Sequence, residues 1–218
     1  SFTGTASDPA PAATMIMDSV GTAHGEVLGT GAVFDATGTS LVLPGGVDTA
    51  GGGYVNLPNG LISEISNVDT SGLTFEAWMK VNAISTYSRM LDFGNSLTGE
   101  GTAGYQTSTI DVIASWNATG NLASEFTLDR TLYNTQYFNT SSGPAIGVLS
   151  HVVLTVDPQT GIRKIYLNGL PTGGTNLALN NNLISMIDDV NNWLGRSNGG
   201  DPRLNGSFDE FRSYKGIM

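Results

Sequence analysis

The chain has 218 residues, of which 39% are hydrophobic and only 13% are charged, and its formal charge is −10. This negative balance disfavours contact with phosphate backbones, so we expect no nucleic-acid partner. The sequence contains no cysteine, which excludes disulfides, zinc thiolates and thiol chemistry. Its 29 glycines, many beside Asn, Asp, Ser or Thr, are typical of short strands joined by polar turns.

The sequence predicts one domain over residues 1–218, because it shows no internal repeat and no linker. No apolar run approaches the ~18 residues of a membrane span, and no signal peptide is present, so we expect no membrane insertion. The chain opens abruptly at SFTGTASDPAPAAT. We therefore interpret it as a monomeric module cut from a larger protein.

Strand signals recur along the chain and helical spacing is scarce. In residues 73–81, every second side chain from Leu73 to Val81 is apolar, which predicts one buried face. Trp78 lies on the other face and is expected to cover its neighbours in the sheet. Residues 59–68 and 183–190 have the spacing of short helices. The clearest strand runs are 54–58, 73–81, 88–94, 109–116, 124–130, 150–157, 162–169, 192–195 and 207–214.

The order of several motifs resembles a laminin-G-like domain of the bacterial concanavalin A-like type. These motifs run from about Asp18 to Tyr214 and are HGEVLG, GGYVNLPNGL, FEAWMKV, RMLDFGN, LSHVVLTVD, KIYLNG and NWLGRS followed by LNGSFDEFRSY. The resemblance implies an all-β jelly-roll sandwich of two antiparallel sheets with adjacent terminal strands. It also implies an extracellular or cell-surface location and binding of carbohydrate, cell-surface glycans or protein partners, often with structural calcium. Because the fold also hosts glycoside hydrolases, it does not settle function.

A catalytic site is not indicated. Glycoside hydrolysis needs two carboxylates about 5–10 Å apart, and the Glu-x-Asp-x-x-Glu strand motif common in similar hydrolases is missing. Asp209 and Glu210 are adjacent in a strand, so they are expected to point to opposite faces. There is no Gly-x-Ser-x-Gly motif. We expect no catalysis, with a hydrolase or lyase that uses a scattered site as the alternative.

The final strand carries the candidate metal ligand. Strict alternation places Asp209 with Ser207 and Phe211, and an ionised carboxylate in such company needs a counter-charge. Ca²⁺ would supply it, because this ion prefers carboxylate and carbonyl oxygens. The resemblance implies a second ligand near the N-terminus, here Asp18; the alternative is that Asp209 caps backbone amides. Glu210 is expected on the other face with Phe208, Arg212 and Tyr214, paired to Arg212.

Candidate ligand-binding residues fall into two groups. Sugars stack on exposed aromatic rings, and Tyr105, Trp116, Tyr133 and Tyr137 lie in an Asn- and Thr-rich stretch. Trp116 is the strongest of them, since it precedes a hairpin turn, whereas Trp78 and Trp193 are expected to pack in the core. The polar candidates, which would fix hydroxyl groups, are Asp92, Asn95, Arg196 and Asp201.

The polar candidates have a competing interpretation. Asp92 and Asn95, with Arg89 and Arg196, could instead form a buried ion network, and Asp201 lies in a Gly-rich loop that could be a simple turn. The sequence favours a non-catalytic extracellular module that binds carbohydrate or a cell-surface glycan with structural calcium. A protein-adhesion or spacer module of a surface adhesin is a further alternative.

Overall fold

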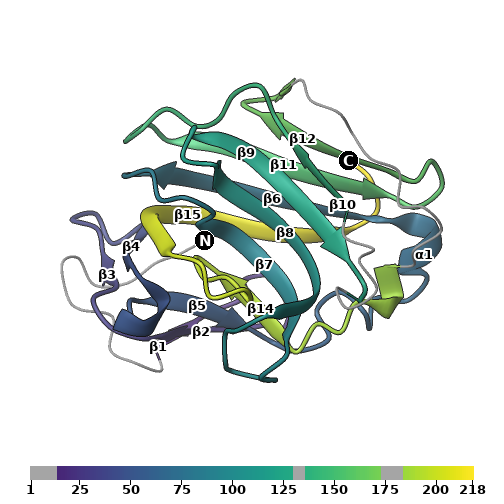
Figure 1. Ribbon diagram of the computed structural model, residues 1–218, viewed down its shortest axis with the longest axis horizontal. Helices are drawn as coiled ribbons and strands as arrows, with labels where there is room; N and C mark the ends of the chain where they lie inside the picture. Colours follow the sequence, from purple (N-terminus) through teal and green to yellow (C-terminus); the bar gives the residue numbers. More distant parts are fainter. Residues whose placement is uncertain (1–13, 130–135, 173–183) are drawn as a thin grey trace.

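The computed structural model describes residues 14–129, 136–172 and 184–218 and shows two antiparallel sheets packed face to face (Figure 1). This is the all-β sandwich that the sequence predicts. The eight-stranded sheet has the order β1 (Thr14–Ile16), β2 (Gly25–Leu28), β5 (Tyr54–Leu57), β14 (Asn191–Leu194), β7 (Arg89–Ser96), β8 (Gln106–Trp116), β9 (Asn121–Thr127) and β10 (Gln136–Asn139).

The seven-stranded sheet has the order β13 (Leu170–Pro171), β12 (Ile162–Leu167), β11 (Ser150–Asp157), β6 (Leu73–Val81), β15 (Arg203–Lys215), β4 (Leu41–Gly46) and β3 (Val33–Phe34). Short helical turns make up the remaining elements, namely η1 (Asp48–Ala50), α1 (Val68–Ser71) and η3 (Ile184–Met186). No helix in the described part of the chain is long and apolar enough to cross a membrane.

The core lies between the sheets, as the alternation in β6 predicts. Leu73, Phe75, Ala77, Met79 and Val81 are all buried. The Phe75 ring meets the Phe93 ring of the opposite sheet edge to face, with centroids 5.1 Å apart, a favoured aromatic arrangement. Trp78 lies on the outer face of β6, as the alternation predicts, and is 38% exposed, so the alternative that it packs in the core is wrong.

The helix expected over residues 59–68 does not form. That segment is a series of turns, and α1 begins only at Val68. Gly60 and Asn67 both adopt left-handed backbone conformations, which interrupt a right-handed helix. The Asp189 carboxylate also accepts a hydrogen bond from the backbone N–H of Ile62 at 2.8 Å. This tertiary contact satisfies an N–H group that would otherwise bond within a helix.

Strand β15 contains a β-bulge that changes the expected facing of its side chains. Phe208 pairs with Met79 and Glu210 pairs with Trp78, so Asp209 is an extra residue in the ladder. Ser207 therefore faces outward and Phe211 inward, and Asp209 cannot share one face with both. The extra residue also moves Phe208 to the core side, away from Glu210. Glu210, Arg212 and Tyr214 do share the outer face, as expected.

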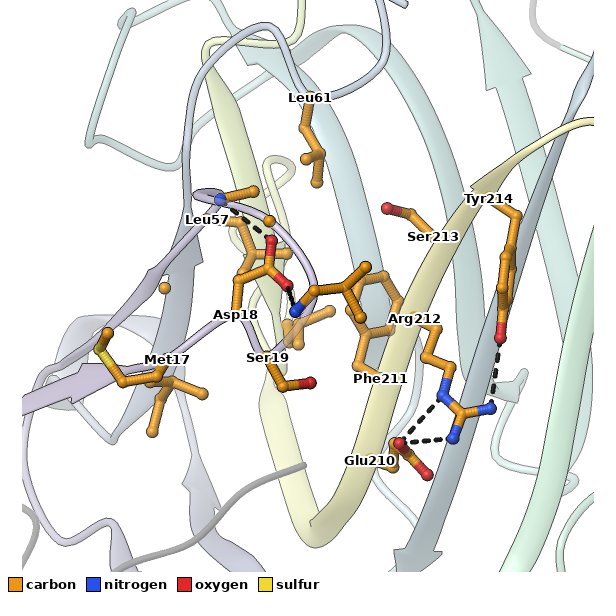
Figure 2. A pocket seen from close by; sticks show the side chains of 16 residues that line it. Met17, Asp18, Ser19, Leu57, Leu61, Glu210, Phe211, Arg212, Ser213 and Tyr214 are labelled. Carbon is orange, nitrogen blue, oxygen red and sulfur yellow. Dashed lines mark hydrogen bonds and ion pairs between the residues drawn. The ribbon is translucent and has the colours of Figure 1, made fainter.

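The terminal strands of the described chain lie in different sheets. β1 pairs with β2 in the eight-stranded sheet, whereas β15 lies between β6 and β4. Pairing with β4 ends at Phe208, and pairing with β6 continues to Lys215. The turn after β1 borders this second half of β15 across a groove (Figure 2).

Candidate functional site

Three aromatic side chains meet at one end of β8, on the face of the eight-stranded sheet turned away from the core. The Trp116 ring stacks on Tyr137, with centroids 5.2 Å apart and an interplanar angle of 21°. The Tyr87 ring meets Trp116 edge to face at 5.3 Å. Tyr137 is half exposed and the other two are partly exposed. We call Tyr87, Trp116 and Tyr137 the aromatic platform.

Asparagine side chains surround the aromatic platform. The Tyr87 hydroxyl donates a hydrogen bond to Oδ1 of Asn117 in the β8–β9 turn. Asn121 is the cross-strand partner of Trp116, and the exposed Asn139 follows Tyr137 by two residues on the same face of β10. Each amide offers both a donor and an acceptor. The platform therefore combines flat apolar rings with groups that can bind hydroxyls.

A buried carboxylate cluster lies on the same face of the sheet. The Arg89 guanidinium lies 2.8 Å from Asp111, 3.2 Å from Asp201, 3.4 Å from Glu125 and 3.7 Å from Asp92. We call these five residues the Arg89 cluster. It adjoins the platform, because Tyr137 is the cross-strand partner of Glu125.

Two loops cover the Arg89 cluster. Asn198, in the loop over residues 195–202, binds Asp92 through its backbone N–H at 2.8 Å and its side-chain amide at 2.9 Å. The loop over residues 97–105 packs on the first one, since the Gly104 N–H donates to the Asn198 carbonyl at 2.9 Å. Asp92 and Asp111 are consequently fully buried, and Asp201 keeps 29% of its side chain exposed.

Burial and mutual repulsion shift the ionisation of the Arg89 cluster. Burial raises the pKa of Asp111 well above its ordinary value; Arg89 opposes this shift, and the charges of Glu125 and Asp92 add to it. Burial likewise raises the pKa of Asp92. Burial would lower the pKa of Arg89, but its carboxylate partners, Asp111 foremost, hold it above its usual value. Arg89 therefore stays cationic beside Asp92 and Asp111, two acids whose burial resists their ionisation.

The structure brings two predicted ligand residues, Asp92 and Asp201, into the Arg89 cluster, which matches the buried-network interpretation of Asp92. Arg196 belongs to a separate group: its Nε lies 2.9 Å from Asp48, and its guanidinium stacks over Trp193 at 4.1 Å. Asn95 donates to Asp188 at 2.6 Å. Asp92, Asn95 and Arg196 therefore do not form one site.

The predicted aromatic residues are likewise dispersed. Trp116 is in the aromatic platform. Tyr105 is 53% exposed in the loop over residues 97–105, next to Gln106, the first residue of β8. Tyr133 lies outside the described residues. Trp193 is fully buried, as expected, and its indole N–H donates to Asn56 at 2.9 Å.

A groove of about 340 Å³ separates the turn after β1 from the second half of β15 (Figure 2). Leu57, Leu61 and Phe211 provide apolar lining. The Asp18 carboxylate lies on the opposite wall and accepts hydrogen bonds from the N–H groups of Val20 at 2.9 Å and Ala23 at 3.1 Å. Backbone hydrogen bonds, that of Val20 foremost, lower the pKa of Asp18. Asp18 is thus ionised and already bound within its own turn.

The two expected calcium ligands are in different surroundings. Asp209 accepts a hydrogen bond from the Ser40 hydroxyl, and the Ser40 N–H donates to Asp35 at 3.2 Å. Asp209 therefore has oxygen-bearing neighbours of the type that Ca²⁺ binds. Asp18 and Asp209 share no contact in the described chain, and no three acidic or histidine residues there converge on a point that could hold a metal. Calcium stays a prediction.

Sequence reasoning missed Tyr87, Asp111 and Glu125. Asp111 and Glu125 face each other across the β8–β9 hairpin, where the Glu125 N–H donates to Asp111 Oδ1 at 2.7 Å. The hairpin turn at Asn117–Asn121 was recognisable, but counting back from the Trp116–Asn121 pair would place Asp111 opposite Phe126, because a bulge between Ile113 and Trp116 shifts the register by one residue. Tyr87 precedes its strand in an irregular segment with a left-handed backbone, and nothing in the sequence signals its contact with Trp116.

Comparison with known proteins agrees with this fold and identifies the class. Residues 49–218 match the family model of the concanavalin A-like lectin/glucanases superfamily. The chain belongs to this superfamily. No curated protein matches it in sequence.

Solved structures with a similar fold come from carbohydrate-active proteins. One is domain 4 of AbnA, a GH43 extracellular arabinanase from Geobacillus stearothermophilus, in complex with arabinotriose; it has a TM-score of 0.64 and 20% identity over 92% of this chain and 87% of that chain. Another is the CBM40 of the Ruminococcus gnavus IT-sialidase bound to α2,3-sialyllactose, with a TM-score of 0.58 and 16% identity over 82% and 91%. The Trypanosoma rangeli sialidase has a TM-score of 0.60 and 15% identity, and the match covers 94% of this chain and 29% of that one.

Proposed function

We propose that this domain is a non-catalytic, extracellular carbohydrate-binding module that binds sugar rings on the aromatic platform. The stacked pair of Trp116 and Tyr137 is the observation that carries the proposal. A partly exposed indole stacked against a half-exposed phenol ring leaves an exposed apolar ring surface with a polar edge, which suits the C–H face of a sugar. The amides of Asn117, Asn121 and Asn139 lie within the same region to bind hydroxyls.

Rigid placement supports this role. Tyr87 is held against Trp116 by its hydrogen bond to Asn117, and Tyr137 is fixed by the pairing of β10 with β9. A ligand then finds the rings already ordered, so little side-chain entropy is lost on binding. Among the solved structures of similar fold, one contains arabinotriose and another sialyllactose, which adds support by analogy of fold.

The state of the carboxylates supports binding without cleavage. Asp111 and Glu125 lie on neighbouring strands, as the two acids of a hydrolase could. Asp111 is fully buried, however, and is bound to Arg89 and to the Glu125 amide. A group in that position cannot approach a glycosidic oxygen without opening the covering loops. We therefore assign the Arg89 cluster a structural role beneath the binding surface.

The test is a glycan array followed by titration calorimetry with the hits, and with arabinotriose and α2,3-sialyllactose in every case. Replacing Trp116 with alanine should reduce affinity by about 5- to 140-fold, if a sugar ring loses about 1–3 kcal/mol, as a nucleic-acid base does when its aromatic stacking partner is removed. Met15→Ala, at an exposed residue of β1 in the same sheet, is the control and should bind as wild type does. Unchanged affinity of the Trp116 variant would refute the platform, and turnover of any glycan would refute the non-catalytic assignment.

Structural calcium at Asp209 is a second part of the proposal. The bulge turns Asp209 out of the regular ladder and toward Ser40, beside Asp35. Carboxylate, hydroxyl and backbone oxygens are the donors that calcium takes. An ion held there would tie β15 to the turn between β3 and β4, and so would stabilise the fold rather than take part in ligand chemistry.

A further inference from the structure

The outer face of the seven-stranded sheet carries a second, separate set of groups around Trp78. Trp78 has His151 of β11 as its cross-strand partner on one side and Glu210 of β15 on the other. The Trp78 ring stacks on the His151 ring with centroids 4.6 Å apart and an interplanar angle of 24°. Trp78 remains 38% exposed, so the indole is neither a core residue nor freely mobile.

A chain of hydrogen bonds fixes this arrangement. His151 Nε2 lies 2.7 Å from Glu76 Oε1, and the other oxygen of Glu76 accepts from the Tyr214 hydroxyl at 2.8 Å and from Arg212 at 3.4 Å. Arg212 in turn donates through Nε and Nη2 to Oε1 of Glu210, at 2.9 and 2.7 Å. Figure 2 shows Arg212 bound to both Glu210 and Tyr214 along β15. Three neighbouring strands therefore hold one indole in place.

Groups capable of binding a ligand remain beside the indole. The two hydrogen bonds from Arg212 both go to Oε1 of Glu210, and Oε2 of that carboxylate accepts none within the described residues. The Arg212 side chain is 48% exposed and that of Glu210 is 29% exposed. One free carboxylate oxygen and one accessible guanidinium edge thus lie next to a flat apolar ring.

We propose that Trp78, Glu210 and Arg212 form a second carbohydrate site, on the opposite sheet from the aromatic platform, which takes a single neutral sugar unit. The row from His151 through Trp78 to Glu210 crosses three strands, or about 10 Å, which fits one ring and its hydroxyls. The sugar stacks on the outward face of the indole, Glu210 Oε2 accepts from one hydroxyl, and Arg212 donates to another.

Charge selects a neutral ligand at this site. Glu76 and Glu210 both bind the one guanidinium of Arg212, so two carboxylates already oppose the positive charge that lies nearest to Trp78 in this set of groups. The chain as a whole carries −10, which adds to the repulsion of anions. A protein partner of the same chemistry would need a much larger flat surface than this row provides.

The inference rests on the proposed function, since both sites bind sugar, but one experiment separates them. The chain has three tryptophans, so a proton–nitrogen correlation spectrum shows three indole signals, which Trp78→Ala and Trp116→Ala assign. The buried Trp193 indole serves as an internal control. The probes are neutral arabinotriose, xylotetraose and cellotetraose and anionic α2,3-sialyllactose, each titrated at two protein concentrations.

At least one neutral probe should shift the Trp78 signal, and this shift should persist in the Trp116→Ala variant and be absent with sialyllactose. Glu210→Ala should weaken the Trp78 response about tenfold, the loss expected for one hydrogen bond to a charged group, and leave the Trp116 response unchanged. A Trp78 signal that no neutral probe moves, while Trp116 responds, overturns the second site and leaves the first intact. A shift of Trp78 that depends on protein concentration without sugar shows self-association and also overturns it. If neither indole responds to any probe, both proposals fail.

Discussion

Replacing Arg89 with methionine removes the guanidinium that four carboxylates share. Asp92 and Asp111 are fully buried, and all four acids lie within 3.7 Å of the guanidinium. Methionine retains most of the aliphatic volume, so the variant mainly tests charge. Removing one partner of a buried ion pair costs about 3–5 kcal/mol, because the remaining charge is left without compensation.

The middle of that range is the appropriate estimate here. Several acids lose their cation together, which increases the cost, but the raised pKa of Asp111 lets it take up a proton and so limits the cost. We therefore expect the free energy of unfolding to fall by about 4 kcal/mol. In a domain of this size about 1 kcal/mol lowers Tm by about 2–4 °C, so Tm should fall by about 8–16 °C. Thermal and urea unfolding followed by circular dichroism measure both quantities.

The matched control is Arg212→Met on the other sheet. Arg212 also pairs with two carboxylates, Glu76 and Glu210, but its side chain is half exposed, so its loss should cost less than about 1 kcal/mol. Should Arg89→Met fail to fold, Arg89→Lys replaces it, because lysine keeps the charge with fewer hydrogen-bond donors. Its free energy of unfolding should then be lower than those of wild type and Arg212→Met, although the variant still folds. Equal losses for Arg89→Met and Arg212→Met would refute the reasoning.

The loss of stability in Arg89→Met should also depend on pH. An acid whose folded pKa lies above its ordinary value favours the folded state when protonated, and this contribution is lost as pH rises through the folded pKa. Asp92 and Asp111 are already in this class, and losing Arg89 raises their pKa values further. The difference in Tm between wild type and Arg89→Met should therefore become smaller as the pH falls from 7 to 5. A difference that widens over this interval would contradict the assignment.

Two further predictions concern the other carboxylates. Burial tends to raise the pKa of Glu76, but hydrogen bonds from Tyr214 and His151 and the charge of Arg212 lower it below its ordinary 4.5. The stability that Glu76 adds relative to Glu76→Gln should therefore be constant above pH 4.5 and disappear as pH falls below that value. Melting curves that show this stability being lost near neutral pH would contradict the prediction. Chelation with EDTA should lower the Tm of calcium-loaded protein by several degrees, since an ion at a hundredfold excess over its Kd adds about 2.7 kcal/mol. Asp209→Ala should abolish this response and Glu210→Ala should retain it, so an unmoved melting curve of the loaded wild type would exclude the site.

The fold was predictable because apolar residues alternate along the strands, as the burial of one face of each sheet requires. In β6, five apolar residues at every second position fill the core, and no alternative register buries them. The outward facing of Glu210 and Arg212 follows from the same alternation. The prediction failed one residue earlier, at Asp209, because a bulge adds a residue without any compositional signal. Alternation in the sequence therefore predicts which way side chains face in regular strands and fails where a bulge interrupts the strand.

The candidate site was less predictable because contacts between distant residues build it. Trp116 was identified from its place before a turn, but its partners Tyr87 and Tyr137 come from two other segments. Asp92 and Asp201 were both chosen as ligand residues, and the structure joins them through Arg89 instead. Their polar chemistry was read from the sequence, but as two separate regions of the chain, and nothing in the sequence joined them. Their burial could not be read, because it depends on how the loops over residues 97–105 and 195–202 fold back.

Loop cover explains why the two proposed sugar sites lie at different places on their sheets. On the eight-stranded sheet, Asn198 and Gly104 bring two loops across the middle strands, so the acids beneath turn to Arg89 and not to solvent. The proposed ligand surface is thereby displaced to the end of β8, where the aromatic platform lies. On the seven-stranded sheet, Trp78, Glu210 and Arg212 occupy the central strands β6 and β15 and are still partly exposed. Under the proposed function, the loops that cross each sheet therefore govern sugar access, while the strands supply the rows of side chains on either face.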